Sequence, residues 1–171
     1  MNNQTKMLSA SSIQAIGTVI AAFETTPAII PEEILRDQLI VYGNVLQGTG
    51  NALLADTEEA DSFGRLGNQV QASGNIMVAW GYLIEMKEET KTTLASKGSL
   101  LQAVGGGVVH SAELEKPSSL LKVYNVSGNL LQIIGNSMQA MGGYRCCGKV
   151  DKRGKKTIRL AGYTVNLEDS V

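Results

Sequence analysis

The chain is poor in the residues on which many catalytic and binding sites depend. Its 171 residues include three prolines, two cysteines, one histidine and one tryptophan, and aromatic residues make up 5%. Charged residues account for 18%, below the share of about 25% in ordinary soluble proteins. A core must therefore be built from Leu, Ile, Val, Ala and Met. Because 19 glycines accompany so little proline, a collagen-like chain and a disordered linker are excluded.

The two cysteines, Cys146 and Cys147, are adjacent in the sequence. Neighbouring cysteines cannot join distant segments, so a disulfide scaffold is excluded. Redox sensing, an intermolecular disulfide and lipid attachment stay open for this pair, although reduced thiols are the simplest interpretation. The first residues lack the apolar segment and cleavage site of a secretory signal, so we expect a cytoplasmic protein.

Candidate catalytic, metal and cofactor sites are weak throughout. His110 is the sole histidine, and no serine lies in a nucleophile motif, so an enzyme is not expected. No ligand spacing indicates a metal. The run Gly105-Gly106-Gly107 resembles a phosphate-binding loop in composition alone, because no Lys-Ser/Thr pair follows it. We therefore expect no catalytic residue, cofactor or metal.

A short phrase of glycine, glutamine and asparagine recurs along the chain. It reads GNVLQGTGN at residues 43–51, GNQVQASGN at 67–75 and GNLLQIIGN at 128–136. Seven residues are two helical turns, so glycines spaced by seven lie along one stripe of a helix. If glycine is heptad position a, asparagine tends to fall at b, a large apolar residue at d and glutamine at e. The glycines in this register are Gly43, Gly50, Gly67, Gly74, Gly81, Gly98, Gly105, Gly128, Gly135 and Gly142.

Glycine inside a helix is unfavourable by about 1 kcal/mol relative to alanine. Its compensating property is that it allows two helix backbones to approach closely. We therefore predict tightly packed glycine seams, in which a larger side chain at Gly74 or Gly135 would force the helices apart.

The pattern predicts an all-α fold, an up-and-down bundle of about five helices with glycine-heptad seams. Proline and acidic residues mark the breaks, including Glu88-Glu89-Thr90, and Asp61 or Ser62 is expected to cap the third helix. The glycine run at 105–107 is expected to weaken or end the fourth helix. The expected helices are residues 5–24, 32–55, 62–87, 91–112 and 117–143.

The chain divides into a helical body, residues 1–144, and a basic C-terminal arm, residues 145–171. The body has a net charge of −5 and the arm +4. Residues 156–167 alternate between apolar and polar, which predicts a short β-hairpin or extended arm. The basic residues of the arm are the candidate partner-binding set, for an anionic membrane surface or an acidic protein; nucleic acid is not expected. They are Lys149, Lys152, Arg153, Lys155, Lys156 and Arg159.

The repeated phrase resembles a family of uncharacterised proteins of Bacillus and its relatives that carry LQAIGN units, the domain of unknown function DUF6944. The likeness covers roughly residues 10–143. It implies a helical architecture but provides no active site to carry over, because the family has no established activity.

Two classes of function follow from the repeat. The leading hypothesis is a non-catalytic structural or self-assembling protein, a homo-oligomer whose glycine, asparagine and glutamine seams pack helices tightly. The alternative is a membrane-associated or pore-like protein, because uncharged stretches such as 66–84 and 123–144 are long enough to cross a bilayer. Their Asn, Gln and Gly content, and a mean hydropathy near zero, favour the first hypothesis. A small-molecule pocket between helices ranks third.

Overall fold

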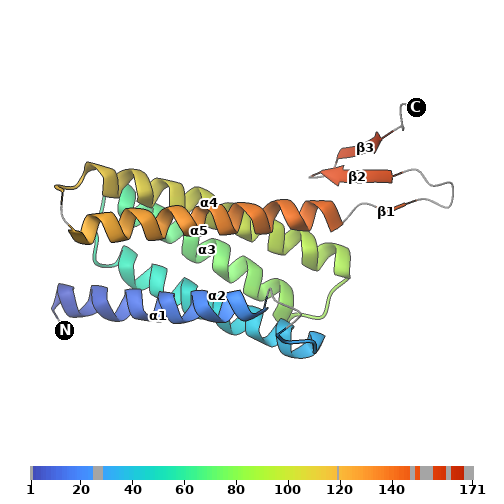
Figure 1. Ribbon diagram of the computed structural model, residues 1–171, viewed down its shortest axis with the longest axis horizontal. Helices are drawn as coiled ribbons and strands as arrows, with labels where there is room; N and C mark the ends of the chain where they lie inside the picture. The colour runs from blue at the N-terminus through green and yellow to red at the C-terminus, as the bar shows by residue number, and fades with distance from the viewer. Residues whose placement is uncertain are drawn as a thin grey trace.

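Five α-helices running alternately up and down form the body of the protein, as a computed structural model shows (Figure 1). The structure describes residues 2–24, 29–118 and 120–146 and three strands beyond them. The predicted all-α, up-and-down bundle is confirmed. The helices are α1 (Asn3–Glu24), α2 (Glu33–Ala55), α3 (Phe63–Leu83), α4 (Glu88–Glu115) and α5 (Leu120–Cys146).

Three short strands follow the helices in the order β1-β2-β3 within one sheet. They are β1 (Lys149–Val150), β2 (Lys156–Leu160) and β3 (Tyr163–Leu167). β2 pairs antiparallel with both of its neighbours, and Ile158 lies opposite Val165. The side chains of this arm, and the residues that connect its strands, lie outside the described part of the chain.

The helix ends follow local chemistry, with two corrections to the expected boundaries. The Ser62 hydroxyl accepts a hydrogen bond of 3.1 Å from the backbone N–H of Arg65, which confirms Ser62 as the cap of α3. α3 ends at Leu83 rather than at residue 87. Glu88 and Glu89 do not break the chain but form the first turn of α4, where negative charge is favourable.

The glycine run at 105–107 does not end α4, contrary to expectation. The helix continues to Glu115. Gly105 lies against the backbone of α3, close to the carbonyl oxygen of Gly67. This tertiary contact compensates for the low helix propensity of glycine, so Gly105 is used for packing.

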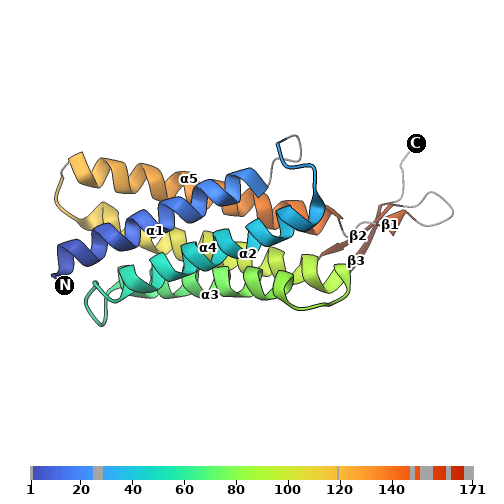
Figure 2. The same ribbon diagram turned by 90° about the horizontal axis from the view of Figure 1, so that it is seen from below.

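Neighbouring helices in the sequence are neighbours in space. α1 packs on α2, α2 on α3, α3 on α4 and α4 on α5. α1 and α2 form the lower layer in Figure 1, and α3, α4 and α5 form the upper layer; Figure 2 shows the same bundle from below. Between the first and last helices, Gln14 Nε2 donates a hydrogen bond of 3.4 Å to Gln132 Oε1. The five helices thus form a series in which each packs on the next, and a hydrogen bond between polar side chains links the first helix to the last.

Candidate functional site

The first glycine seam joins α1 to α2. A Cβ atom added at Gly17 would lie 2.7 Å from the carbonyl oxygen of Gly43, and one added at Gly50 would lie 2.8 Å from that of Ala10. Both distances are too short for a real Cβ contact, and the obstructing atoms belong to backbone. Glycine is therefore required by the closeness of the two helices.

The second seam joins α3 to α4 in the same way. A Cβ at Gly67 would lie 2.7 Å from the Gly105 oxygen, and one at Gly74 would lie 2.6 Å from the Gly98 oxygen. The contact is reciprocal, because a Cβ at Gly98 would lie 2.7 Å from the Gly74 oxygen. The predicted seams are confirmed in these two helix pairs.

A different pair of positions joins α2 to α3 and α4 to α5. An added Cβ at Gly48 would lie 3.1 Å from Cβ of Asn75, and one at Gly106 would lie 3.0 Å from Cγ1 of Ile133. These residues occupy heptad positions b and f, beside the glycines at a. We call positions a and e the glycine face and positions b and f the second face. Every buried residue of α3 and α4 falls on one of these two faces.

The glycine stripe of α5 is not packed within the chain. A Cβ added at Gly128 or at Gly135 would meet nothing within 4 Å. α5 instead contacts α4 through its second face, where Asn136 and Ala140 are buried. The expectation that Gly135 is tightly packed was therefore wrong, because no other helix lies against Gly135 within the described structure.

The interior of the bundle is polar. The largest fully buried side chains are those of Gln71, Asn51 and Asn75. Gln102 Nε2 of α4 donates a hydrogen bond of 3.0 Å to Asn44 Oδ1 of α2. The buried hydrophobic residues among those described are all alanine or valine. Amides and small residues thus take the place that large apolar side chains occupy in a water-soluble bundle.

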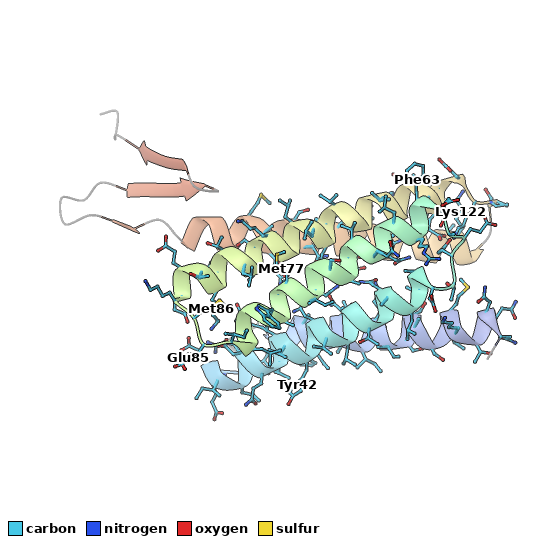
Figure 3. All side chains as sticks on the ribbon, turned by 180° about the vertical axis from the view of Figure 1, so that it is seen from behind. Tyr42, Phe63, Met77, Glu85, Met86 and Lys122 are labelled. Atoms are coloured by element: carbon cyan, nitrogen blue, oxygen red, sulfur yellow. The ribbon has the colours of Figure 1, made fainter. Side chains whose placement is uncertain are left out.

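Large apolar side chains lie on the outside instead. Leu8 is 71% exposed, Ile76 64% and Leu131 71%. Tyr42 and Phe63 point away from the bundle in Figure 3. Similar residues cover the outer surface of every helix. Monomeric soluble proteins rarely expose this much apolar surface around a polar interior.

Most charged residues of the body lie toward the two ends of the bundle. Lys97 is an exception, because it precedes Gly98 of α4, which lies opposite Gly74 near the middle of α3. Each helix contains a stretch of 15 to 22 residues without Asp, Glu, Lys or Arg, which we call its uncharged stretch. At a rise of 1.5 Å per residue these stretches measure about 22–33 Å. One end of the bundle, the Lys6 end, contains the start of α1, and the other, the Asp37 end, contains the start of α2 (Figure 1). The stretches are residues 7–23, 38–55, 66–84, 98–112 and 123–144.

Comparison with known proteins agrees with the repeat. Residues 5–165 match the model of a family of unknown function, DUF6944. The chain belongs to this family. No curated protein and no solved structure matches it. Membership of DUF6944 therefore assigns no function to the chain.

Ion pairs at both ends connect the helices of this DUF6944 protein. At the Asp37 end, Lys91 Nζ of α4 lies 2.7 Å from Asp37 Oδ2 of α2 and 4.5 Å from the centroid of the Tyr82 ring. Burial lowers the pKa of Lys91, but the hydrogen bond and charge of Asp37 outweigh it and raise the pKa above its usual 10.5. At the Lys6 end, a hydrogen bond from Lys6 lowers the pKa of the Asp56 carboxyl group.

A shallow apolar groove of about 290 Å³ lies between α2 and α3. Val45, Ile76 and Trp80 line its outer part and Asn44 lies among its lining residues. Trp80 is 55% exposed, so the groove opens on the outer surface of the bundle rather than into the polar interior.

The structure does not bring together the residues that the sequence singled out. Among the described residues, no group of three His, Cys, Asp or Glu side chains is placed to hold a metal. His110 is half-buried in α4, and its Nδ1 has no hydrogen-bond partner. Of the basic arm, Lys149 lies in β1 and Lys156 and Arg159 lie in β2, but their side chains are outside the described part. Lys152, Arg153 and Lys155 are outside it altogether, as are the side chains of Cys146 and Cys147.

The apolar exterior and the amide-rich interior were not predicted. The signal was present in the heptads, because Asn and Gln recur beside the glycines. Composition alone does not show which side of a helix faces the interior, and the structure supplies this assignment.

Proposed function

We propose that this protein is a non-catalytic structural component of a membrane, a five-helix bundle embedded in the bilayer. The observation that carries the proposal is the reversed arrangement of the side chains. Amides and glycines fill the interior, large apolar residues cover the outside, and the charged residues of the body other than Lys97 lie toward the two ends. Lipid tails favour this distribution, whereas water opposes it.

Exposed hydroxyl groups within the uncharged stretches support the proposal. Ser12, Thr49 and Ser73 are exposed, and each hydroxyl donates to the carbonyl oxygen four residues earlier, at 2.8, 2.8 and 2.9 Å. Water would satisfy such groups without help from the chain. In a bilayer, where no water is present, a hydroxyl has to find its partner within the protein.

The aromatic residues of the body lie near its two ends. Each stands within five residues of a charged residue that bounds an uncharged stretch. Trp and Tyr favour the boundary between lipid tails and head groups, about 30 Å apart across a bilayer. Their positions therefore fit the lengths of the uncharged stretches. These residues are Phe23, Tyr42, Phe63, Trp80, Tyr82, Tyr124 and Tyr144.

The hydropathy of the helices is low for such a role, and the structure suggests why. One described helix, α1 over Asn3–Phe23, is long and apolar enough to cross a membrane by length and composition. The other stretches contain the buried Asn, Gln and Gly residues, which reduce the average although they face away from the surroundings. Small residues at helix contacts are typical of packing in lipid.

Self-assembly through the glycine seams of the first four helices, one form of the leading hypothesis from the sequence, is less well supported. The seams of α1 to α4 are filled within one chain. They therefore stabilise the fold and are not available to a partner.

Two exposed isoleucines provide a matched test. Ile76 lies inside the uncharged stretch of α3 and is 64% exposed; Ile34 precedes the stretch of α2 and is 77% exposed. Placing arginine at the centre of a membrane helix costs about 2.5–3.5 kcal/mol, so Ile76→Arg should reduce insertion strongly and Ile34→Arg should not. The measurement is co-flotation with phospholipid vesicles after alkaline washing.

In the same samples, the fluorescence of Trp80 should be quenched by lipids that carry a bromine in the acyl chain. The proposal would be wrong if the full chain is stable and monodisperse without detergent and does not float with vesicles. Equal flotation of the two variants would also contradict it.

A further inference from the structure

The glycines of α5 lie on a face that no helix backbone covers within the described chain, although Gln132 at position e of this face accepts a hydrogen bond from Gln14 of α1. Gly128 and Gly135 have open space where a Cβ would be, whereas the corresponding glycines of the first four helices contact backbone. Leu131 and Met138, at position d beside them, are 71% and 64% exposed. The stripe lies in the longest uncharged stretch of the molecule, residues 123–144.

The order of the helix contacts identifies what covers this face. α1 meets α2 through glycine faces, α2 meets α3 through second faces, α3 meets α4 through glycine faces, and α4 meets α5 through second faces. The next contact in this alternation joins the glycine face of α5 to another glycine face. Those of α1 to α4 are already used within the chain. The remaining glycine face is that of α5 in a second copy.

We propose that two copies of the protein associate through α5 in an antiparallel glycine seam centred on Gly135. Both internal seams are antiparallel and place glycine opposite glycine or alanine, as Gly74 opposite Gly98 shows. A two-fold axis at Gly135 places this residue against its own copy and Gly128 against Gly142 of the second copy. Such an interface uses the same patch on both copies and closes as a dimer.

The glutamines of α5 fit the same register. In the internal seam, a Cβ at Gly74 would lie 2.9 Å from Cγ of Gln102, and one at Gly105 would lie 2.8 Å from Cγ of Gln71. Each of these glycines thus receives the stem of a position-e glutamine. The two-fold axis brings Gln139 of the second copy onto Gly135. Gln139 is exposed in the single chain, where its Oε1 accepts a hydrogen bond of 3.4 Å from the Ser99 hydroxyl of α4.

This inference goes beyond the proposed membrane role and does not depend on it. The seam excludes lipid or water equally, because it brings backbone to backbone. The proposed contact is defined by its helix, α5, by the glycine face of that helix and by a register centred on Gly135.

Disulfide trapping tests the register. The native thiols are first removed by Cys146→Ser and Cys147→Ser, and Gly135→Cys is then introduced. Because the two copies of residue 135 face each other, mild oxidation should give a disulfide-linked dimer. The matched control is Gly107→Cys on α4, since Gly107 also has open space around it but lies off the glycine face. Equal cross-linking of the two variants would overturn the proposal.

Overpacking tests the closeness of the seam. Gly135→Leu should weaken dimerisation by about tenfold or more, the effect of the 1–3 kcal/mol typical of overpacking, whereas Gly107→Leu should not. The readout is the mass of the particle by sedimentation in density-matched detergent, with helicity by circular dichroism as the check on folding. A Gly135→Leu variant that remains dimeric would contradict the seam.

The two proposals fail separately. A protein that floats with vesicles but cross-links equally at positions 135 and 107 retains its membrane role and loses the dimer. A protein that cross-links in detergent-free buffer and does not float gives the opposite result.

Discussion

At the scale of single residues, the central fact is that identical glycines have different surroundings. Gly74 lies against the backbone of a neighbouring helix, and Gly107 and Gly135 lie in open space. The cost of glycine in a helix, about 1 kcal/mol relative to alanine, is the same at all three. Close packing offsets the cost at Gly74 but does not do so at the other two within a single chain.

Alanine substitutions separate the contribution of helix propensity from that of close packing. Gly107→Ala should stabilise the protein by up to about 1 kcal/mol, because it gains helix propensity without a contact. Gly74→Ala should destabilise it by about 1–3 kcal/mol, because the new Cβ would lie 2.6 Å from the Gly98 oxygen. Chemical unfolding followed by circular dichroism gives both values. The seam would be looser than described if the two substitutions change the stability in the same direction.

The seven-residue spacing predicted the stripe on every helix but not its occupancy. The spacing through Gly128 and Gly135 is the same as that through Gly67 and Gly74. Whether a glycine stripe has a neighbour depends on the number of helices and their order. Because glycine faces pack in pairs, an odd number of helices leaves one glycine face unpaired. This property of the whole arrangement is not encoded in any one heptad.

At the scale of helices, the sequence predicted how many there are and which faces carry glycine, but not all of their ends. Acidic residues at 88–89 were interpreted as a break although they begin α4, and the glycine run at 105–107 was interpreted as an end although it packs on α3. In both cases a local preference was outweighed by position or tertiary contact. The candidate basic arm, by contrast, lies beyond the described side chains, so its assignment remains a prediction.

The ion pair of Lys91 with Asp37 predicts a pH dependence for the contact between α4 and α2. The pKa of Lys91 is raised above 10.5 in the folded protein, so the pair stabilises the fold fully below that pH. The stabilisation is lost as the pH rises through the folded pKa. Asp37→Asn should therefore lower the melting temperature at pH 8, and the difference from the parent should shrink above about pH 10.5. Thermal melts across this range measure it, and a constant difference would argue against the pair.

At the scale of the whole molecule, the basic residues are distributed unequally between the two ends. The Lys6 end contains four Lys or Arg residues, Lys6, Arg65, Lys116 and Lys122. Lys97 lies part-way along α4, and the remaining 10 belong to the Asp37 end or to the arm that follows α5 in the sequence. In membrane proteins, Lys and Arg next to helix ends are enriched on the cytoplasmic side.

This imbalance predicts an orientation for the embedded bundle, and the prediction rests on the proposed membrane role. The Asp37 end and the basic arm should face the cytoplasm, and the start of α1 should face outward, because five helices place the two ends of the body on opposite sides. On the cytoplasmic side the arm would meet anionic head groups, and this attraction would contribute about 1 kcal/mol for each basic residue near the surface.

In intact cells, a membrane-impermeant thiol reagent should label Asn2→Cys in a Cys146→Ser, Cys147→Ser background. The native thiols of the parent chain should react only after the membrane is permeabilised. Labelling of both positions in intact cells, or of Cys146 and Cys147 alone, would show that the charge imbalance does not set the orientation.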